Sequence, residues 1–317
     1  MPRHTKKDRS QETITRRAAL RGIGTALCAA PLAAFVGCGG TNGNTGSGGA
    51  GGAGGSGGSG GSGGAGGSGG TGGAGNGEWA TGGTASMSGD YPDPFTDDPG
   101  ATCALVCAMT LGPCYAETVV RKDISEGSAG LPMRLALRVV DASCKPVEGA
   151  EVDVWHTSAA GLYSGDDSVE MCTGNDAEAL AARWFRGVQT TDANGRVDFD
   201  SCFPGWYSSR TIHIHFTVRV GGSEYVTSQL FFPDELSDEI VATQPIYKDR
   251  GARDTTNEND TVIAADAAAD YTLQTKKMSD GALLAWKTLV IRSSLADALC
   301  QAPGGMGGPG GGPPPGP

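Results

Sequence analysis

The sequence predicts an all-β domain with the architecture of a β-sandwich. Apolar and polar residues alternate in several short segments, turn-forming residues separate these segments, and long regular helical patterns are scarce. An alternation of period two gives a strand one face toward a core and one face away from it. Many short strands at close spacing are typical of two sheets packed face to face.

The expected strands are rich in β-branched and aromatic residues, and they cover residues 133–141, 150–156, 196–200, 211–220 and 224–232. The stretches "SCKPVEG", "DANG" and "GG" supply turn signals between them. Residues 271–278 and 282–291 flank "SDG" and are expected to form a closing hairpin, although the second segment also permits a helix. Residues 233–270 are expected to be a long loop with one short helix.

Residues 1–37 have the pattern of an export signal. Arg16 and Arg17 precede an apolar run, as in a twin-arginine signal, and an ordinary secretory signal is the alternative. The run is too short to span a bilayer. The following "FVGC" resembles a lipobox with Phe35 in place of the usual leucine, so Cys38 is a candidate lipid anchor. We therefore expect an exported, extracytoplasmic protein, either secreted or held at a membrane as a lipoprotein.

Composition divides the remaining chain into three parts. Residues 38–90 are nearly all Gly, Ser, Ala and Thr and are expected to form a flexible linker. Residues 303–317 are rich in Gly and Pro and are expected to be a disordered tail. Residues 91–302 remain as one domain, which is long enough to bury a hydrophobic core.

The charge of the chain argues against a nucleic-acid partner. After residues 1–37, the sequence holds 17 Lys and Arg against 33 Asp and Glu, a formal net charge of −16. No basic patch that would contact phosphates is present in this sequence. The acidic surface instead favours solubility.

Seven of the nine cysteines follow the signal and its lipobox. Disulfides suit an exported protein, but their pairing is not readable from the sequence. The odd count predicts one unpaired thiol. A zinc site at Cys103 and Cys107 is a weaker alternative, because no second pair of cysteines has the matching spacing.

Two of the four histidines lie one residue apart in the apolar stretch "TIHIHF". On a strand, His213 and His215 would share a face about 6.6 Å apart, where both imidazoles can reach one metal. Two ordinary histidines on a half-buried strand are the alternative. A third ligand would come from His156 or from the tyrosines, of which Tyr163 and Tyr207 follow or precede expected strands. Phenolate oxygen suits ferric iron, but it forms at neutral pH only where a cation replaces the proton.

Four segments carry a resemblance to a known family: "DVWHTSAAGLYSG" (153–165), "FRGVQTTDANGRVDF" (185–199), "PGWYSSRTIHIHF" (204–216) and "TSQLFF" (227–232). In this order and spacing they resemble the intradiol ring-cleavage dioxygenases, the family of catechol and protocatechuate dioxygenases. The exported branch of small dioxygenase-like proteins is the most similar. The resemblance covers residues 112–232 well and 233–300 loosely.

The resemblance implies a non-haem Fe(III) site held by four ligands, namely Tyr163, Tyr207, His213 and His215. It also implies catalytic roles for Tyr207 as a base, for Arg210 beside the substrate and for Gln229 behind it. The implied reaction uses O2 to cleave a catechol-type ring between its two hydroxyl-bearing carbons, giving a muconate-type diacid. His156 matches no ligand and is expected to be structural, while Trp155 and Trp206 are expected to pack around the site.

The chain also departs from the catechol dioxygenases. Residues 1–90 provide a signal and linker in place of the helical segment that joins subunits in those enzymes, so the oligomeric state stays open. The substrate-side loops differ, so the identity of the aromatic diol stays open too. Two alternative functions remain: a non-catalytic cell-surface binding module on the same scaffold, and a copper or zinc hydrolase that uses His156, His213 and His215.

Overall fold

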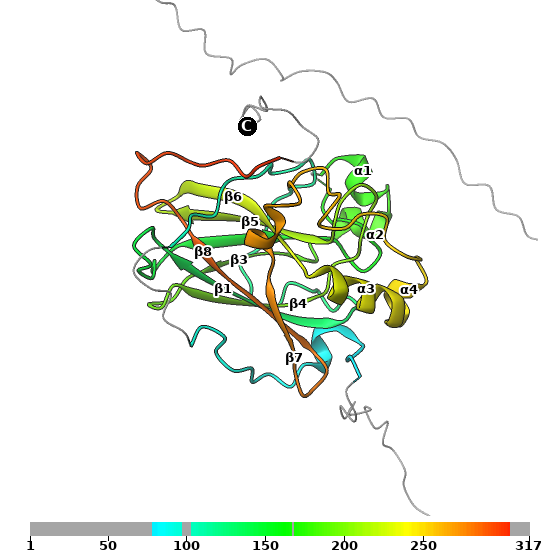
Figure 1. Ribbon diagram of the computed structural model, residues 1–317. Coiled ribbons are helices and arrows are strands. Elements are labelled where there is room, and N and C mark those ends of the chain that lie inside the picture. The colour runs from blue at the N-terminus through cyan, green and yellow to red at the C-terminus, as the bar shows by residue number, and fades with distance from the viewer. Residues whose placement is uncertain (1–77, 97–102, 167, 305–317) are drawn as a thin grey trace, which may run out of the picture. The chain divides into compact units, whose positions relative to one another are not determined.

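The computed structural model describes residues 78–96, 103–166 and 168–304. The predicted export signal, most of the predicted linker, Cys38 and nearly all of the predicted tail lie outside these ranges. Within them, eight strands form two four-stranded sheets (Figure 1), so the predicted all-β sandwich is confirmed. No helix in the described ranges is both long enough and apolar enough to cross a membrane.

The first sheet has the strand order β4-β1-β8-β7. Its members are β1 (Pro132–Val140), β4 (Arg196–Cys202), β7 (Gln274–Lys277) and β8 (Leu283–Val290). Strand β1 is antiparallel to β4 and parallel to β8, while β7 and β8 form the predicted hairpin. The segment at 282–291, for which a helix was also open, is therefore a strand.

The second sheet has the order β3-β2-β5-β6, and each pair of neighbours is antiparallel. Its members are β2 (Glu151–Trp155), β3 (Arg186–Thr190), β5 (His213–Val220) and β6 (Ser223–Phe231). Strand β3 was not among the expected strands. Its sequence, "RGVQT", contains a glycine and only one β-branched apolar residue, so pairing with β2 decides its conformation.

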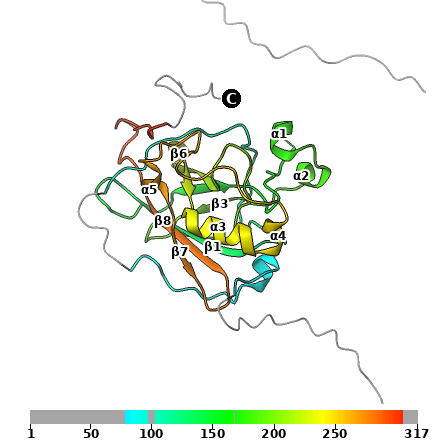
Figure 2. The same cartoon turned by 45° about the vertical axis from the view of Figure 1, so that its right-hand side comes forward.

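The structure contains more helix than the sequence predicts. Helices α3 (Asp234–Thr243), α4 (Pro245–Lys248) and α5 (Ala268–Tyr271) lie where one short helix in a loop was expected. Figure 2 shows α3 and α4 next to each other, and α1 (Glu170–Thr173) next to α2 (Ala177–Ala181). Two acidic residues in the first turn of α3 favour its start, and the residue before Pro245 is disfavoured in a helix, which favours its end.

The domain begins earlier than the sequence indicates. Residues 78–90, which were assigned to the flexible linker, include a 3-10 turn (Gly83–Ser86) and contact the sandwich. The indole nitrogen of Trp79 donates a hydrogen bond of 2.8 Å to Glu239, and the Trp79 ring lies under Lys277. The amide of Ala80 donates to the carbonyl of Gly281 at 2.8 Å. The predicted boundary after residue 90 is therefore too late, because one tryptophan supplies contact area that the surrounding glycines lack.

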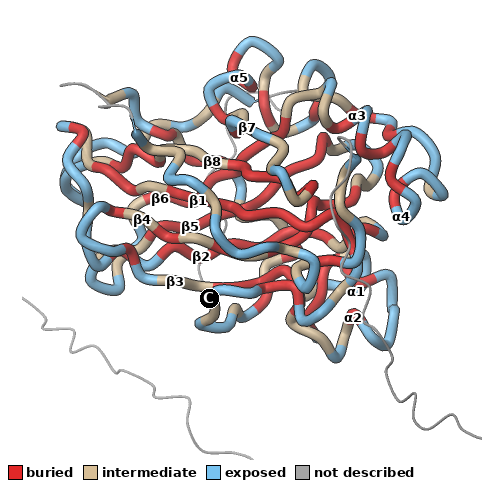
Figure 3. Tube along the Cα trace, turned by 90° about the horizontal axis from the view of Figure 1, so that it is seen from below, coloured by how far each residue is buried: buried red, intermediate tan, exposed pale blue. Residues whose placement is uncertain are grey.

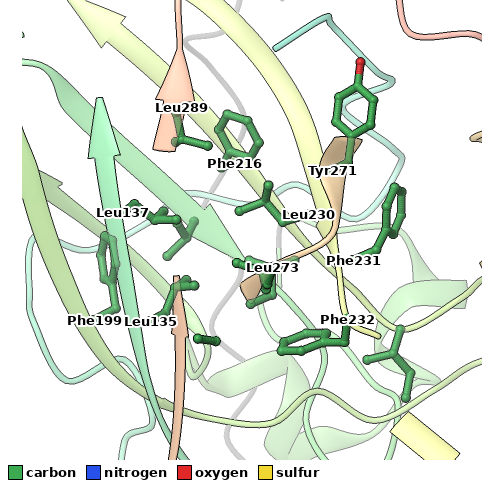
Figure 4. Packing of buried hydrophobic residues seen from close by; sticks show 14 of the residues in the cluster. Leu135, Leu137, Phe199, Phe216, Leu230, Phe231, Phe232, Tyr271, Leu273 and Leu289 are labelled. Atoms are coloured by element: carbon green, nitrogen blue, oxygen red, sulfur yellow. The ribbon is translucent and has the colours of Figure 1, made fainter. Parts of the chain in front are cut away.

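The main hydrophobic core lies between the two sheets. Buried residues follow the length of the central strands in Figure 3. Leu135 and Phe199 from the first sheet and Phe216 and Leu230 from the second are all fully buried in this core (Figure 4). Because residues on a strand alternate between faces, this arrangement leaves the other face of β5 for His213 and His215.

Three disulfides join cysteines in the described ranges: Cys103–Cys144, Cys107–Cys300 and Cys114–Cys172. Cys202 is buried and unpaired within these ranges, in agreement with the odd count. The zinc alternative at Cys103 and Cys107 is wrong, because each of these cysteines is bonded to a different distant partner. The sequence left the pairing open because each bond joins residues at least 41 positions apart.

Candidate functional site

Three of the predicted site residues, His213, His215 and Gln229, lie on the outer face of the second sheet. Strand β5 pairs with β2 and β6, and the register places His215 opposite Trp155 on one side and Gln229 on the other. Residues directly opposite each other on neighbouring strands point to the same face. Three adjacent strands therefore form a row of an indole, an imidazole and an amide beneath the site.

Four predicted side chains converge at one point. The Nε2 atom of His213 is 3.2 Å from the hydroxyl oxygen of Tyr163, 3.2 Å from that of Tyr207 and 3.1 Å from Nε2 of His215. Tyr163 comes from the loop after β2, Tyr207 from the turn before β5, and the histidines from β5 itself. Tyr163, His213 and His215 are buried, and Tyr207 is partly exposed.

The separations of these four atoms suit a metal ion. An imidazole nitrogen binds a first-row metal at about 2.0–2.1 Å, so two neighbouring ligands at a right angle stand about 3 Å apart. The distances around His213 agree with that spacing. Two phenol oxygens and two imidazole nitrogens form a donor set that fits ferric iron.

Burial keeps these side chains neutral when no cation is bound. It raises the pKa of Tyr163 well above the usual value, with the neighbouring Tyr207 as the next cause. Burial also raises the pKa of Tyr207, against the lowering effect of the Arg210 charge. It lowers the pKa values of His213 and His215 well below the usual value, and Arg210 lowers them further. Both imidazoles thus keep a lone pair for a metal, and both phenols need a cation to release their protons.

The imidazoles are oriented by different contacts. The Nδ1 atom of His213 lies 2.6 Å from the carbonyl oxygen of Thr211, so a proton on Nδ1 is donated there and Nε2 faces the site. The ring of His215 stacks on Trp155 at 5.0 Å between centroids and 7° between planes. Trp155 therefore packs against the site, as the sequence predicted. Trp206, which precedes Tyr207, lies under the guanidinium of Arg250.

Arg210 and Gln229 also meet beside the four side chains. A guanidinium nitrogen of Arg210 donates to the amide oxygen of Gln229, and the amide nitrogen of Gln229 donates to the carbonyl of Thr110 at 3.0 Å. The Nε atom of Arg210 donates to Asp260 at 2.9 Å. These contacts hold the guanidinium from two sides.

Sequence reasoning missed Asp260. Its carboxylate is buried and accepts hydrogen bonds from the backbone amides of Thr211 and Val262, both at 2.8 Å, as well as from Arg210. Asp260 lies in the acidic stretch "RDTTNEND", where no local pattern separates it from its neighbours. Only the path of the 233–270 segment brings this carboxylate to Arg210.

Sequence reasoning also missed Gly112. Its φ of +76° lies in the left-handed region, and a Cβ atom at this position would stand 3.2 Å from Cε1 of His215. Glycine therefore lets the backbone approach the imidazole closely.

His156 lies apart from the four converging side chains. Its two ring nitrogens contact the carbonyl of Thr157 and the hydroxyl of Ser201, each at 2.8 Å, and the residue is fully buried. Both nitrogens are therefore engaged, as expected for a structural histidine. In the described ranges, no group of three or more His, Cys, Asp or Glu side chains is arranged to hold a metal. The alternative of a copper or zinc site with three histidines is thus unsupported.

The comparisons with known proteins agree with this geometry. The model of a dioxygenase family matches residues 110–279. The chain is 35% identical over 120 residues to the protocatechuate 3,4-dioxygenase beta chain of Burkholderia cepacia, covering 35% of this chain and 47% of that protein. It is 26% identical over 133 residues to a catechol 1,2-dioxygenase of Pseudomonas sp. strain EST1001, covering 38% and 44%. The chain thus spans about half the length of these curated relatives.

A solved structure is similar over a larger part of the chain. The intradiol ring-cleavage dioxygenase from Tetranychus urticae superimposes with a TM-score of 0.53 at 28% sequence identity. The match covers 62% of this chain and 99% of that one.

We predict that His156 makes the metal-free protein less stable in acid. Burial lowers its pKa to about 4, whereas the pKa of a histidine in an unfolded chain is about 6.5. Between these values the unfolded chain binds a proton that the folded protein does not, so the free energy of unfolding falls as the pH falls. The contribution of His156 is at most about 3 kcal/mol.

Urea denaturation of the metal-free protein near pH 7 and near pH 4.5 measures this loss. A His156→Gln variant lacks the titrating ring and should show a smaller decrease between the two pH values. An equal decrease in the variant and the parent protein would contradict the assignment.

Proposed function

Because this chain belongs to the intradiol ring-cleavage dioxygenase family, we propose that it is a non-haem Fe(III) enzyme acting on a catechol-type diol. It uses O2 to cleave the aromatic ring between the two hydroxyl-bearing carbons and yields a muconate-type diacid. The observation that carries this proposal is the convergence of Tyr163, Tyr207, His213 and His215. Family membership and the similarity to named dioxygenases support it.

The four side chains are suited to ferric iron by charge as well as by geometry. When bound, the iron would supply chelation of both substrate oxygens and withdraw electron density from the ring, which makes the ring reactive toward O2. Two phenolates offset two of its three positive charges, and the neutral imidazoles add none. The buried surroundings strengthen the attraction between the cation and the phenolates.

The two tyrosines differ in how firmly they are held. Tyr163 is buried, and its backbone amide donates to the carbonyl of Cys172 at 2.8 Å. Tyr207 is partly exposed and lies in a turn before β5. Tyr207 is therefore the phenolate that can move aside and accept a proton from a substrate hydroxyl.

Arg210 is placed to stabilise negative charge on the substrate ring. Its guanidinium is held by Gln229 and Asp260, so it needs little reorganisation as charge develops. Its charge already affects the pKa values of Tyr207 and both histidines. This influence supports a catalytic role for Arg210, with Gln229 as its support.

We also propose that the protein works outside the cytoplasm. Three disulfides within one domain are typical of an oxidising compartment. Lipid attachment at Cys38 stays a prediction from the sequence. Recovery of the mature protein in the cytoplasmic fraction of cells, with its cysteines reduced, would contradict the extracytoplasmic location.

We predict that the iron-loaded protein is coloured by charge transfer from phenolate to Fe(III). Replacing Tyr163 or Tyr207 by Phe removes one phenolate and should weaken and shift the visible band, and the double variant should lose it. Tyr225→Phe is the matched control, because Tyr225 lies near Arg292 and not in the site. Absorption spectra with and without catechol measure the band and its shift on diol binding.

Oxygen uptake with a panel of catechols tests turnover in the same preparations. A parent protein that stays colourless after loading with ferric iron would contradict the proposed metal site. A coloured protein that consumes no oxygen with any diol would favour the binding-module alternative.

We predict that Asp260→Asn lowers kcat/KM by about 10- to 100-fold, the range seen when a supporting partner at a metal site is removed. The resting charge-transfer band should be largely retained, because Asp260 accepts its hydrogen bonds from Arg210 and from the backbone amides of Thr211 and Val262 rather than from a ligand side chain. Asp254→Asn is the control: Asp254 accepts from the nearby Ser208 hydroxyl at the surface. Steady-state oxygen uptake measures both variants, and equal losses would show that the effect does not pass through Arg210.

A further inference from the structure

A short segment ties together residues that belong to different parts of the site. We call residues 110–115 the site strap. At its start, the carbonyl of Thr110 accepts a hydrogen bond of 3.0 Å from the amide of Gln229. Two residues later, the backbone of Gly112 lies against the imidazole of His215. The first half of the site strap therefore contacts two strands of the second sheet, β5 and β6.

The end of the site strap supports His215 from another direction. The ring of Tyr115 packs edge-on against Trp155, with 4.9 Å between centroids and 78° between planes. Trp155 in turn stacks on His215. The Tyr115 hydroxyl donates to Asp153 at 3.0 Å, which anchors the strap to β2.

Cys114 connects the site strap to the loop that carries Tyr163. Its disulfide partner is Cys172, whose carbonyl accepts the backbone amide of Tyr163 at 2.8 Å. The side chains of Cys114, Cys172, Trp155 and Tyr163 form one buried cluster, against which Tyr207 packs. Arg186 joins the same two segments, because one of its guanidinium nitrogens donates to the carbonyls of both Cys114 and Ser164.

Tyr163 needs such a connection more than the histidines do. His213 and His215 lie on a strand that is hydrogen-bonded on both sides, whereas Tyr163 lies in a loop. A ligand on a loop keeps its geometry only where surrounding contacts restrict the loop. The Cys114–Cys172 bond gives the backbone hydrogen bond from Tyr163 to Cys172 a covalent link to the site strap, beside the hydrogen bonds that Arg186 donates to Ser164.

We propose that the Cys114–Cys172 disulfide is a positioning element of the metal site, which sets Tyr163 relative to His215 and Gln229 through the site strap. This inference rests on the proposed iron site for its spectroscopic consequence. Its structural consequence, restriction of Tyr163, does not require the metal. The two sulfurs are bonded to each other and are not among the four converging donors, so their role is positional.

The test compares two variants that each lack one disulfide, Cys114→Ser with Cys172→Ser, and Cys103→Ser with Cys144→Ser. The control bond joins residues outside the cluster of Tyr163, Trp155, Cys114 and Cys172. Hydrogen exchange of the Tyr163 amide is measured in the metal-free proteins. Iron release to a chelator and the charge-transfer band are measured after loading with ferric iron.

We expect removal of the Cys114–Cys172 bond to speed exchange at the Tyr163 amide and iron release by about tenfold or more, the lower range for losing a supporting partner. The charge-transfer band should shift as well. The control variant should retain exchange, release and band within about twofold of the parent. Unchanged values in the Cys114/Cys172 variant, or equal changes in both variants, would overturn the proposal.

The outcomes separate this inference from the proposed function. A parent protein without a charge-transfer band would contradict the iron proposal, while hydrogen exchange at the Tyr163 amide still decides whether the disulfide restricts the loop.

If the Cys114/Cys172 variant does not fold, Gly112→Ala supplies the test with every disulfide intact. Its new Cβ crowds His215 and displaces the site strap, so faster exchange at Tyr163 supports the coupling and unchanged exchange overturns it.

Discussion

The close approach of two phenols and two imidazoles, three of them buried and Tyr207 partly exposed, is the constraint on which the rest of the site depends. Polar groups lose their contacts with water when they are buried, so each needs a partner within the protein or a bound cation. Here Nε2 of His213 lies within 3.2 Å of the other three groups. A trivalent cation at this point would replace the two phenol protons and satisfy all four groups together.

Strand β5 contributes to the hydrophobic core with one face and to the site with the other. Ile214 and Phe216 of β5 pack in the core between the sheets, while His213 and His215 face outward. The core thus fixes the histidines without occupying the site. The tyrosines are outside regular strands, and they are held by the turn before β5 and by the site strap with its disulfide. The positions of these two tyrosines therefore depend on a disulfide and on backbone hydrogen bonds, since no strand holds them.

Local sequence patterns were sufficient to predict most of the strands, but they did not predict the structure of the segments that connect them. The strands around residues 133–141 and 211–220 were predictable because large apolar residues recur there at every second position. Strand β3 was missed because five residues with a glycine carry too weak a signal. The segment from residue 233 onward holds three helices where one short helix was expected, because its acidic, polar sequence resembles a loop. Trp79 was assigned to a linker because the linker was recognised by its average composition, which does not show the contacts of a single tryptophan side chain.

The sequence by itself determined the all-β class and the placement of His213 and His215 on one face, since both follow from a period of two within a few residues. Its family resemblance also singled out Tyr163, Tyr207, Arg210 and Gln229. Only the tertiary structure decided that these groups meet, that Asp260 holds Arg210 and that Cys114 pairs with Cys172. The contacts of Arg210 with Gln229 and Asp260, and of Cys114 with Cys172, join residues 19 to 58 positions apart. Their geometry is set by the packing of the sheets and by the paths of loops, which no local pattern encodes.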